Sequence, residues 1–210
     1  MGQKVNPNAL RLGVLTTWNS RWFSQKKSEF RDTLIEDIKL REFLTKRLRP
    51  AGISRIEIER SIKTIDILLH VARPGVAIGR GGEELTKLKK EVEQFFADRK
   101  NNVKIDIRIE PVKKPDLDPY LVGRNVAEQL ERRMPHKRVV NQAMSRVIGA
   151  GAKGVKIVLA GRIAGAEISR TEKYGQGTVP LSTIREDVRF AKAPALTKSG
   201  YVGVKVWICL

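Results

Sequence analysis

The sequence predicts an α+β protein built from two domains. Residues 62–71 and 103–109 each alternate apolar and polar side chains, which is the period of a strand that buries one face. Apolar residues at helical spacing occupy the segments before and between these two strands. Three prolines within residues 111–119 exclude a regular element, and a second series of helices and strands follows them. A chain of 210 residues is long enough for two small domains.

The first domain is predicted to cover residues 28–110. Ser28 is the expected N-cap of its first helix, which stops at Pro50. The elements after it are two strands, a short apolar turn, a glycine loop, a helix and a strand, at residues 53–59, 62–71, 76–78, 79–82, 83–98 and 103–109. The resulting order is helix, strand, strand, short helix, helix, strand.

Residues 111–119 are predicted to be a linker, and residues 120–210 a second α+β domain. Two helices, at about 120–133 and 136–148, are separated at Pro135. Further strands are expected at residues 155–159, 167–174, 184–190 and 202–208. We expect the two helices to pack on a mostly antiparallel sheet.

Residues 1–27 are basic and rich in turn-forming residues, and no helical or strand period persists through them. Trp18 and Trp22 lie in this polar segment and need a surface to cover them. We therefore predict an N-terminal arm that lies on a binding partner, with Lys4, Arg11 and Arg21 as candidate RNA contacts.

The charge of the chain points to such a partner. It carries 41 Lys and Arg against 23 Asp and Glu, a net charge of +18. This much like charge favours a polyanion, either nucleic acid or an anionic membrane surface. The excess is +10 over residues 111–210 and +6 over 1–49, but only +2 over 50–110. The electrostatic anchor is therefore expected in the arm and the second domain.

A membrane partner is not expected, because no segment approaches the roughly 18 apolar residues that a spanning helix needs. The start of the chain also lacks the apolar core of a signal peptide. Cys209 is the only cysteine, so no intrachain disulfide can form. The simplest prediction is a cytoplasmic protein, and an organelle matrix remains an alternative.

The loop Gly79-Arg80-Gly81-Gly82 is the most informative motif. Glycines let the backbone approach a phosphate closely, and the N-terminus of the next helix presents free N–H groups to it. An isolated G-x-x-G is more often a tight turn. The element order around this one, however, is that of a type II KH domain (αββααβ), whose loop clamps about four nucleotides of RNA.

Other phosphate, metal and catalytic motifs fail. No Gly-Lys-Ser or Gly-Lys-Thr of a Walker loop occurs, and the G-x-G-x-x-G at residues 149–154 follows a helix and precedes a strand, the reverse of a dinucleotide fold. With Cys209, His70 and His136 alone, no ordinary zinc site can be assembled. We expect His70 to be solvated or paired, and we predict no catalytic residue, metal or cofactor.

Arg132, Arg133, Lys137 and Arg138 surround the turn at Pro135. Such a cluster is usually a solvated face. In a chain of this charge with an RNA-binding domain upstream, phosphate contact is the favoured interpretation.

Short motifs spread over the whole chain are shared with a known family. They include Lys4-Val5-Asn6-Pro7-Asn8, Trp18-Asn19-Ser20-Arg21-Trp22-Phe23, Ala72-Arg73-Pro74-Gly75, Ile78-Gly79-Arg80-Gly81-Gly82, Gln129-Leu130-Glu131-Arg132-Arg133, Gly161-Arg162-Ile163-Ala164-Gly165-Ala166-Glu167 and Gly203-Val204-Lys205-Val206-Trp207-Ile208. Together with Met1-Gly2-Gln3 at the start, they resemble the bacterial-type small-subunit ribosomal protein number three.

The resemblance implies a structural component of the small ribosomal subunit that is not an enzyme. Members bind ribosomal RNA in the head beside other head proteins, and they line the channel through which messenger RNA enters. By motif position, Arg132 and Arg133 match family residues that contact messenger RNA, and Arg162 lies in another shared motif and is a further candidate RNA contact. Asn141-Gln142 departs from a Lys-Arg pair of many members. The alternatives are a free KH-type RNA chaperone or regulator, and a nuclease or DNA-lesion lyase.

Overall fold

The computed structural model describes residues 4–61, 63–96 and 104–210. The chain divides into two compact units. One unit is formed by residues 18–113 and the other by residues 1–17 together with 114–210. Both combine helices with a four-stranded sheet, which confirms the predicted α+β class.

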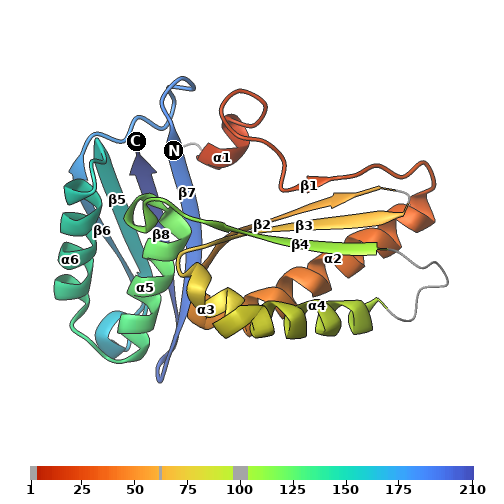
Figure 1. Cartoon of the computed structure of the whole chain (residues 1–210). Coiled ribbons are helices and arrows are strands. Elements are labelled where there is room, and N and C mark those ends of the chain that lie inside the picture. Colours follow the sequence, from red (N-terminus) through yellow and green to blue (C-terminus); the bar gives the residue numbers. More distant parts are fainter. Residues whose placement is uncertain (1–3, 62, 97–103) are drawn as a thin grey trace. The chain divides into compact units, whose positions relative to one another are not determined.

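The unit of residues 18–113 has the predicted order of elements (Figure 1). They are α2 (Lys27–Arg47), β2 (Ile53–Arg60), β3 (Thr64–Val71), α3 (Pro74–Ile78), α4 (Glu83–Phe95) and β4 (Lys104–Pro111). Strand β3 pairs antiparallel with β2 and parallel with β4, and a two-residue strand, β1 (Ser20–Arg21), runs parallel to β2 at the edge. This is the αββααβ arrangement of a type II KH domain.

Alternation along β3 builds the core of this unit. Ile65, Ile67 and Leu69 are buried because every second side chain points to the helices, where Leu40 and Leu88 meet them. Burial of one such side chain contributes roughly 1.5–3 kcal/mol. The sheet therefore packs one face against α2 and α4 (Figure 1).

Some predicted boundaries shift. Helix α2 begins at Lys27, so Ser28 lies inside its first turn, and no side chain caps the helix. The expected helix end at Asp98 and strand start at Val103 fall outside the described residues, as do Met1-Gly2-Gln3.

The predicted single arm of residues 1–27 is instead divided at Thr17 between the two units. Ser20 pairs with Ile58 of β2. The indole Nε1 of Trp22 donates a 2.8 Å hydrogen bond to Asp37, and its ring lies 5.1 Å from that of Phe30. Trp22 thus finds its covering surface within the chain, whereas Trp18 stays 68% exposed.

The second unit packs two helices on an antiparallel sheet, as predicted (Figure 1). Its elements are α5 (Pro119–Glu131), α6 (His136–Gly149), β5 (Gly154–Gly161), β6 (Arg170–Gly177), β7 (Val188–Thr197) and β8 (Gly200–Cys209), with a short α1 (Pro7–Leu10) beside β7. The sheet order is β6-β5-β8-β7. The carboxylate of Asp118 accepts from the backbone N–H groups of Tyr120 and Leu121, so α5 starts within the expected linker. Strand β7 begins four residues later than predicted.

Candidate nucleic-acid interface

The glycine loop joins α3 to α4 and requires glycine at several positions. Gly79, Gly81 and Gly82 all have positive φ angles, between 63° and 81°, which side chains disfavour. At Gly79 an added Cβ would lie 2.8 Å from Cγ of Glu84, whereas at Gly81 and Gly82 it would meet only open space. The loop therefore presents bare backbone outward, with the exposed side chain of Arg80 beside it.

Carboxylates beside the loop weaken its pull on an anion. Glu84, in the first turn of α4, lies 3.1 Å from Lys87 and 3.2 Å from Arg47. The hydrogen bond from Lys87 is the main cause that lowers the pKa of Glu84, so this carboxyl is charged at neutral pH. Glu83 precedes it. The exposed Arg80 therefore shares the loop with two carboxylates, of which Glu84 is already ion-paired to Lys87 and Arg47.

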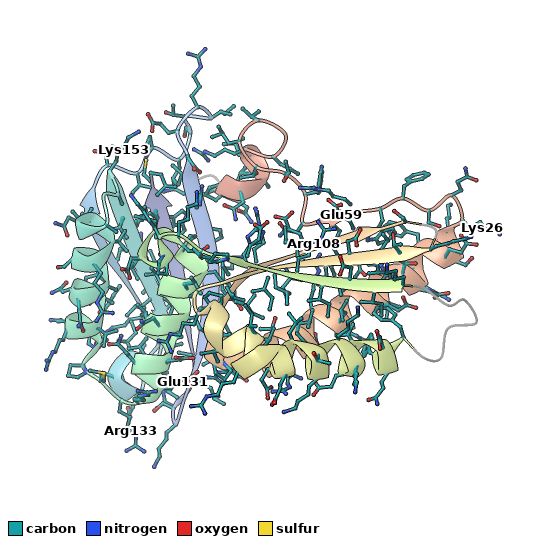
Figure 2. All side chains as sticks on the ribbon, viewed as in Figure 1. Lys26, Glu59, Arg108, Glu131, Arg133 and Lys153 are labelled. Carbon is teal, nitrogen blue, oxygen red and sulfur yellow. The ribbon has the colours of Figure 1, made fainter. Side chains whose placement is uncertain are left out.

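The turn between α5 and α6 carries a denser group of cations, which we call the basic turn: Arg132, Arg133, Lys137 and Arg138. All four side chains are exposed, and none is ion-paired to a carboxylate among the residues that the structure describes. Figure 2 shows Arg133 extending away from the ribbon beyond the end of α5. Its backbone adopts a φ of 61°, while its N–H donates to the Leu130 carbonyl. These hydrogen-bonded backbone contacts hold the turn while the cationic heads reach solvent.

A pocket of about 280 Å³ adjoins the basic turn. Its walls combine apolar side chains such as Leu130, Met134 and Ile163 with the cations Arg133 and Arg162. The structure therefore brings together two predicted RNA contacts that stand far apart in sequence. The Nε of Arg162 donates a 2.8 Å hydrogen bond to the carbonyl of Ala166, which fixes the direction of that side chain.

Both histidines lie beside carboxylates, but only His70 is hydrogen-bonded to its carboxylate, because the buried Nε2 of His136 has no hydrogen-bond partner among the described residues. The Nε2 atom of His136 lies 3.1 Å from Glu172, and Nε2 of His70 lies 3.1 Å from Glu57. His70 is thus paired rather than solvated. Within the described ranges no group of three or more His, Cys, Asp and Glu side chains could hold a metal ion, and no helix there could span a membrane.

Arg11 corrects one expectation. Its side chain is fully buried and donates hydrogen bonds to the carbonyl groups of Pro7, Pro180, Leu181, Thr183 and Glu186. A guanidinium enclosed by its own chain cannot reach a phosphate, so the prediction that Arg11 contacts RNA is wrong for this fold. Its role is to fasten α1 to the segment that precedes β7.

The other two arm candidates have different surroundings. Arg21 lies 2.5 Å from Glu59 and 3.3 Å from Glu57, so carboxylates partly neutralise it. Lys4 is exposed and close enough to Lys156 that its charge lowers the pKa of Lys156, after burial, which is the larger cause.

Sequence reasoning missed a group of lysines around Lys156 on the C-terminal sheet, because each comes from a different strand. Only the order and register of the strands place them together.

A KH fold with an open glycine loop, joined to a domain with a cluster of exposed cations, defines a class of RNA-binding protein. The KH domain family profile matches residues 39–117, and the profile of the ribosomal protein S3 C-terminal domain matches residues 126–208. The Small ribosomal subunit protein uS3 of Desulforamulus reducens is 46% identical over 208 residues, covering 99% of this chain and 91% of the relative. That of Desulforudis audaxviator is 48% identical, covering 99% and 93%. The chain belongs to the small ribosomal subunit protein uS3 family.

Proposed function

We propose that this chain is a structural, RNA-binding component of the small ribosomal subunit, without a catalytic step of its own. It holds ribosomal RNA in the head of the subunit beside neighbouring head proteins. Through the basic turn it also contacts messenger RNA in the channel by which the messenger enters. It acts as part of cytoplasmic ribosomes. Membership in the uS3 family supports the ribosomal role over that of a free KH-type regulator or a nuclease.

The observation that carries the messenger contact is the exposure, at one turn, of four cations that form no ion pair with any carboxylate the structure describes. Lys137 and Arg138 open α6, whose first turn also has unsatisfied backbone N–H groups because no side chain caps it. Phosphate contacts carry no sequence information, so such a surface can hold any messenger without stopping on one sequence. The pocket at Arg133 and Arg162 extends the same positive surface.

The test is the rate of elongation on two matched messages, one with a stable hairpin and one without. In the test ribosomes, Arg132, Arg133, Lys137 and Arg138 are all changed to Ala. We expect normal incorporation into subunits, because the side chains are exposed. We also expect slower passage through the hairpin and nearly unchanged rates on the unstructured message.

A charge-matched control changes four exposed lysines outside the basic turn to Ala: Lys46, Lys90, Lys113 and Lys114. This control should translate both messages normally. Equal slowing of both messages by the test variant would indicate an assembly defect. No slowing at all would leave the basic turn as an ordinary solvated surface, and either result would overturn the messenger contact.

A further inference from the structure

The C-terminal sheet has one face against α5 and α6, and a second face that neither of these helices covers. Ile157 and Val206 belong to the core between sheet and helices. Because side chains alternate along a strand, their neighbours Lys156, Lys205 and Trp207 belong to the second face.

The register of the strands arranges this second face in two adjacent rows. In the first row, Phe190 of β7 lies opposite Trp207 of β8, which lies opposite Lys156 of β5. In the second row, the residues that lie opposite one another from β7 to β6 are Lys192, Lys205, Val158 and Lys173. We call the four lysines and two aromatic residues of these rows the lysine face.

The charges on this surface are unbalanced. Lys192 and Lys205 lie directly opposite each other, an arrangement that destabilises an antiparallel pair. Neither row contains a carboxylate, and no ion pair reaches these lysines from any described Asp or Glu. Lys4 and Lys173 both help to lower the pKa of Lys156, the smaller causes after burial, which shows that cations gather there. The repulsion between these lysines therefore lowers folding stability, and no described carboxylate offsets it.

The aromatic pair holds two of the ammonium groups in place. The rings of Phe190 and Trp207 stack with centroids 4.9 Å apart. Lys156 Nζ lies 5.5 Å from the centre of the Trp207 ring, and Lys192 Nζ lies 5.8 Å from that of Phe190. Each ammonium makes a cation–π interaction with the ring, and its N–H groups can still donate hydrogen bonds to an acceptor on a ligand. The lysines are therefore partly ordered before any ligand binds.

We infer that the lysine face is a second RNA-binding surface, which binds the sugar–phosphate backbone of RNA independently of base sequence. Neighbouring strands lie about 4.8 Å apart, so the second row spans roughly 14 Å from β7 to β6. Phosphates repeat at short, regular intervals along a nucleic acid, so several can meet such a row at once. This inference rests on the proposed ribosomal function and assigns it a contact surface distinct from the basic turn.

A charge reversal at Lys205 separates ligand binding from folding. Lys205→Glu sets a carboxylate opposite Lys192 and removes the like-charge pair, so the unliganded protein should melt at an equal or higher temperature. The same change should weaken the affinity of the full chain for purified small-subunit ribosomal RNA about tenfold or more at 150 mM salt. A residue with only a structural role would not show higher stability together with weaker binding.

The matched control is Lys114→Glu, which makes the same change of charge at an exposed position outside the lysine face. We expect it to weaken binding to the RNA only slightly. If Lys205→Glu binds as tightly as wild type, or no more weakly than the control, the lysine face is not an RNA surface. If polyglutamate competes for wild type as well as RNA does, the partner is an acidic protein segment and the inference is overturned.

The outcomes also distinguish the inference from the function on which it rests. If the wild type binds RNA tightly and Lys205→Glu binds it equally tightly, only the RNA-binding role of the lysine face is overturned. Absence of RNA binding by wild type itself would overturn both.

Discussion

The Arg11 guanidinium donates a 2.7 Å hydrogen bond to the backbone carbonyl of Thr183, a residue 172 positions further along the chain. Because Arg11 is fully buried and the carbonyls around it all belong to the chain, it works as an internal fastener. It holds α1 and residues 180–186 together, and Asn8 adds two hydrogen bonds to the backbone of Phe190 at the lysine face.

Arg11→Ala should therefore destabilise the protein strongly. Because Arg11 is buried, the change should leave the RNA-binding surface of the folded protein as it is. Removing the side chain leaves five carbonyl groups, most of them part-buried, without this donor, which we expect to cost about 2–4 kcal/mol of unfolding free energy. Urea unfolding measures this loss, and Arg162→Ala, at an exposed position, serves as the control with a small effect. Weaker RNA binding at full stability would show that Arg11 does reach the ligand.

RNA binding by the wild-type chain should depend steeply on salt. Each phosphate contact contributes roughly 0.7–0.9 to the slope of log affinity against log salt concentration. The basic turn and the lysine face together offer several contacts, so we expect a slope greater than about 4 in magnitude. Filter binding or fluorescence anisotropy across a salt series gives the slope. A value near 1 would contradict binding dominated by phosphates.

Replacing Arg80 and Gly81 by Asp should remove any nucleotide contact at the glycine loop. The new carboxylates repel phosphate, whereas the open space at Gly81 and the tolerance of Asp for positive φ keep the fold intact. Because Glu83 and Glu84 already limit attraction there, we expect the variant to enter subunits normally. The measurement is its abundance in purified small subunits, with circular dichroism as the folding control. Loss from subunits despite normal folding would make the loop the main anchor.

The pair Tyr174 and Glu172 predicts a pH effect of defined sign. The Tyr174 hydroxyl donates to Glu172 and is the main cause that lowers the pKa of that carboxyl. A carboxyl with a lowered pKa adds stability above its ordinary value, and this stability is lost as the pH falls through the lowered pKa. Burial, and after it the hydrogen bond to Glu172, raises the pKa of Tyr174 to about 12. The stability that the protonated tyrosine contributes is therefore present below pH 10 and is lost as the pH rises through about 12.

Tyr174→Phe should consequently raise the pKa of Glu172 and reduce the loss of stability in acid. NMR titration of the carboxyl gives the first result, and urea unfolding between pH 3 and 7 gives the second. Tyr201→Phe, at a side chain that is 69% exposed, is the control and should change neither. An unchanged pKa of Glu172 would show that Arg170 and His136 alone hold the carboxylate.

Local patterns were sufficient for most of the fold. The alternation Ile65, Ile67, Leu69 predicts a strand because the period of a strand is set by its own backbone. The glycines at 79–82 predict the loop for a similar reason, since their conformational freedom is a property of the residue. Strand β1 could not be found in this way: two residues are too short to show a period, and they are extended only because β2 pairs with them.

The sequence by itself determined the KH order of elements, the excess of positive charge in the C-terminal half and the basic turn at Pro135, because each depends on neighbours along the chain. Only the tertiary structure decided which cations face outward. Arg11 and Arg132 are the same residue type in basic surroundings, yet one is enclosed by carbonyls from residues 180–186 and the other is exposed. The lysine face likewise depends on strands that pair out of sequence order, and hydrogen-bonded register, not local composition, sets which side chains meet.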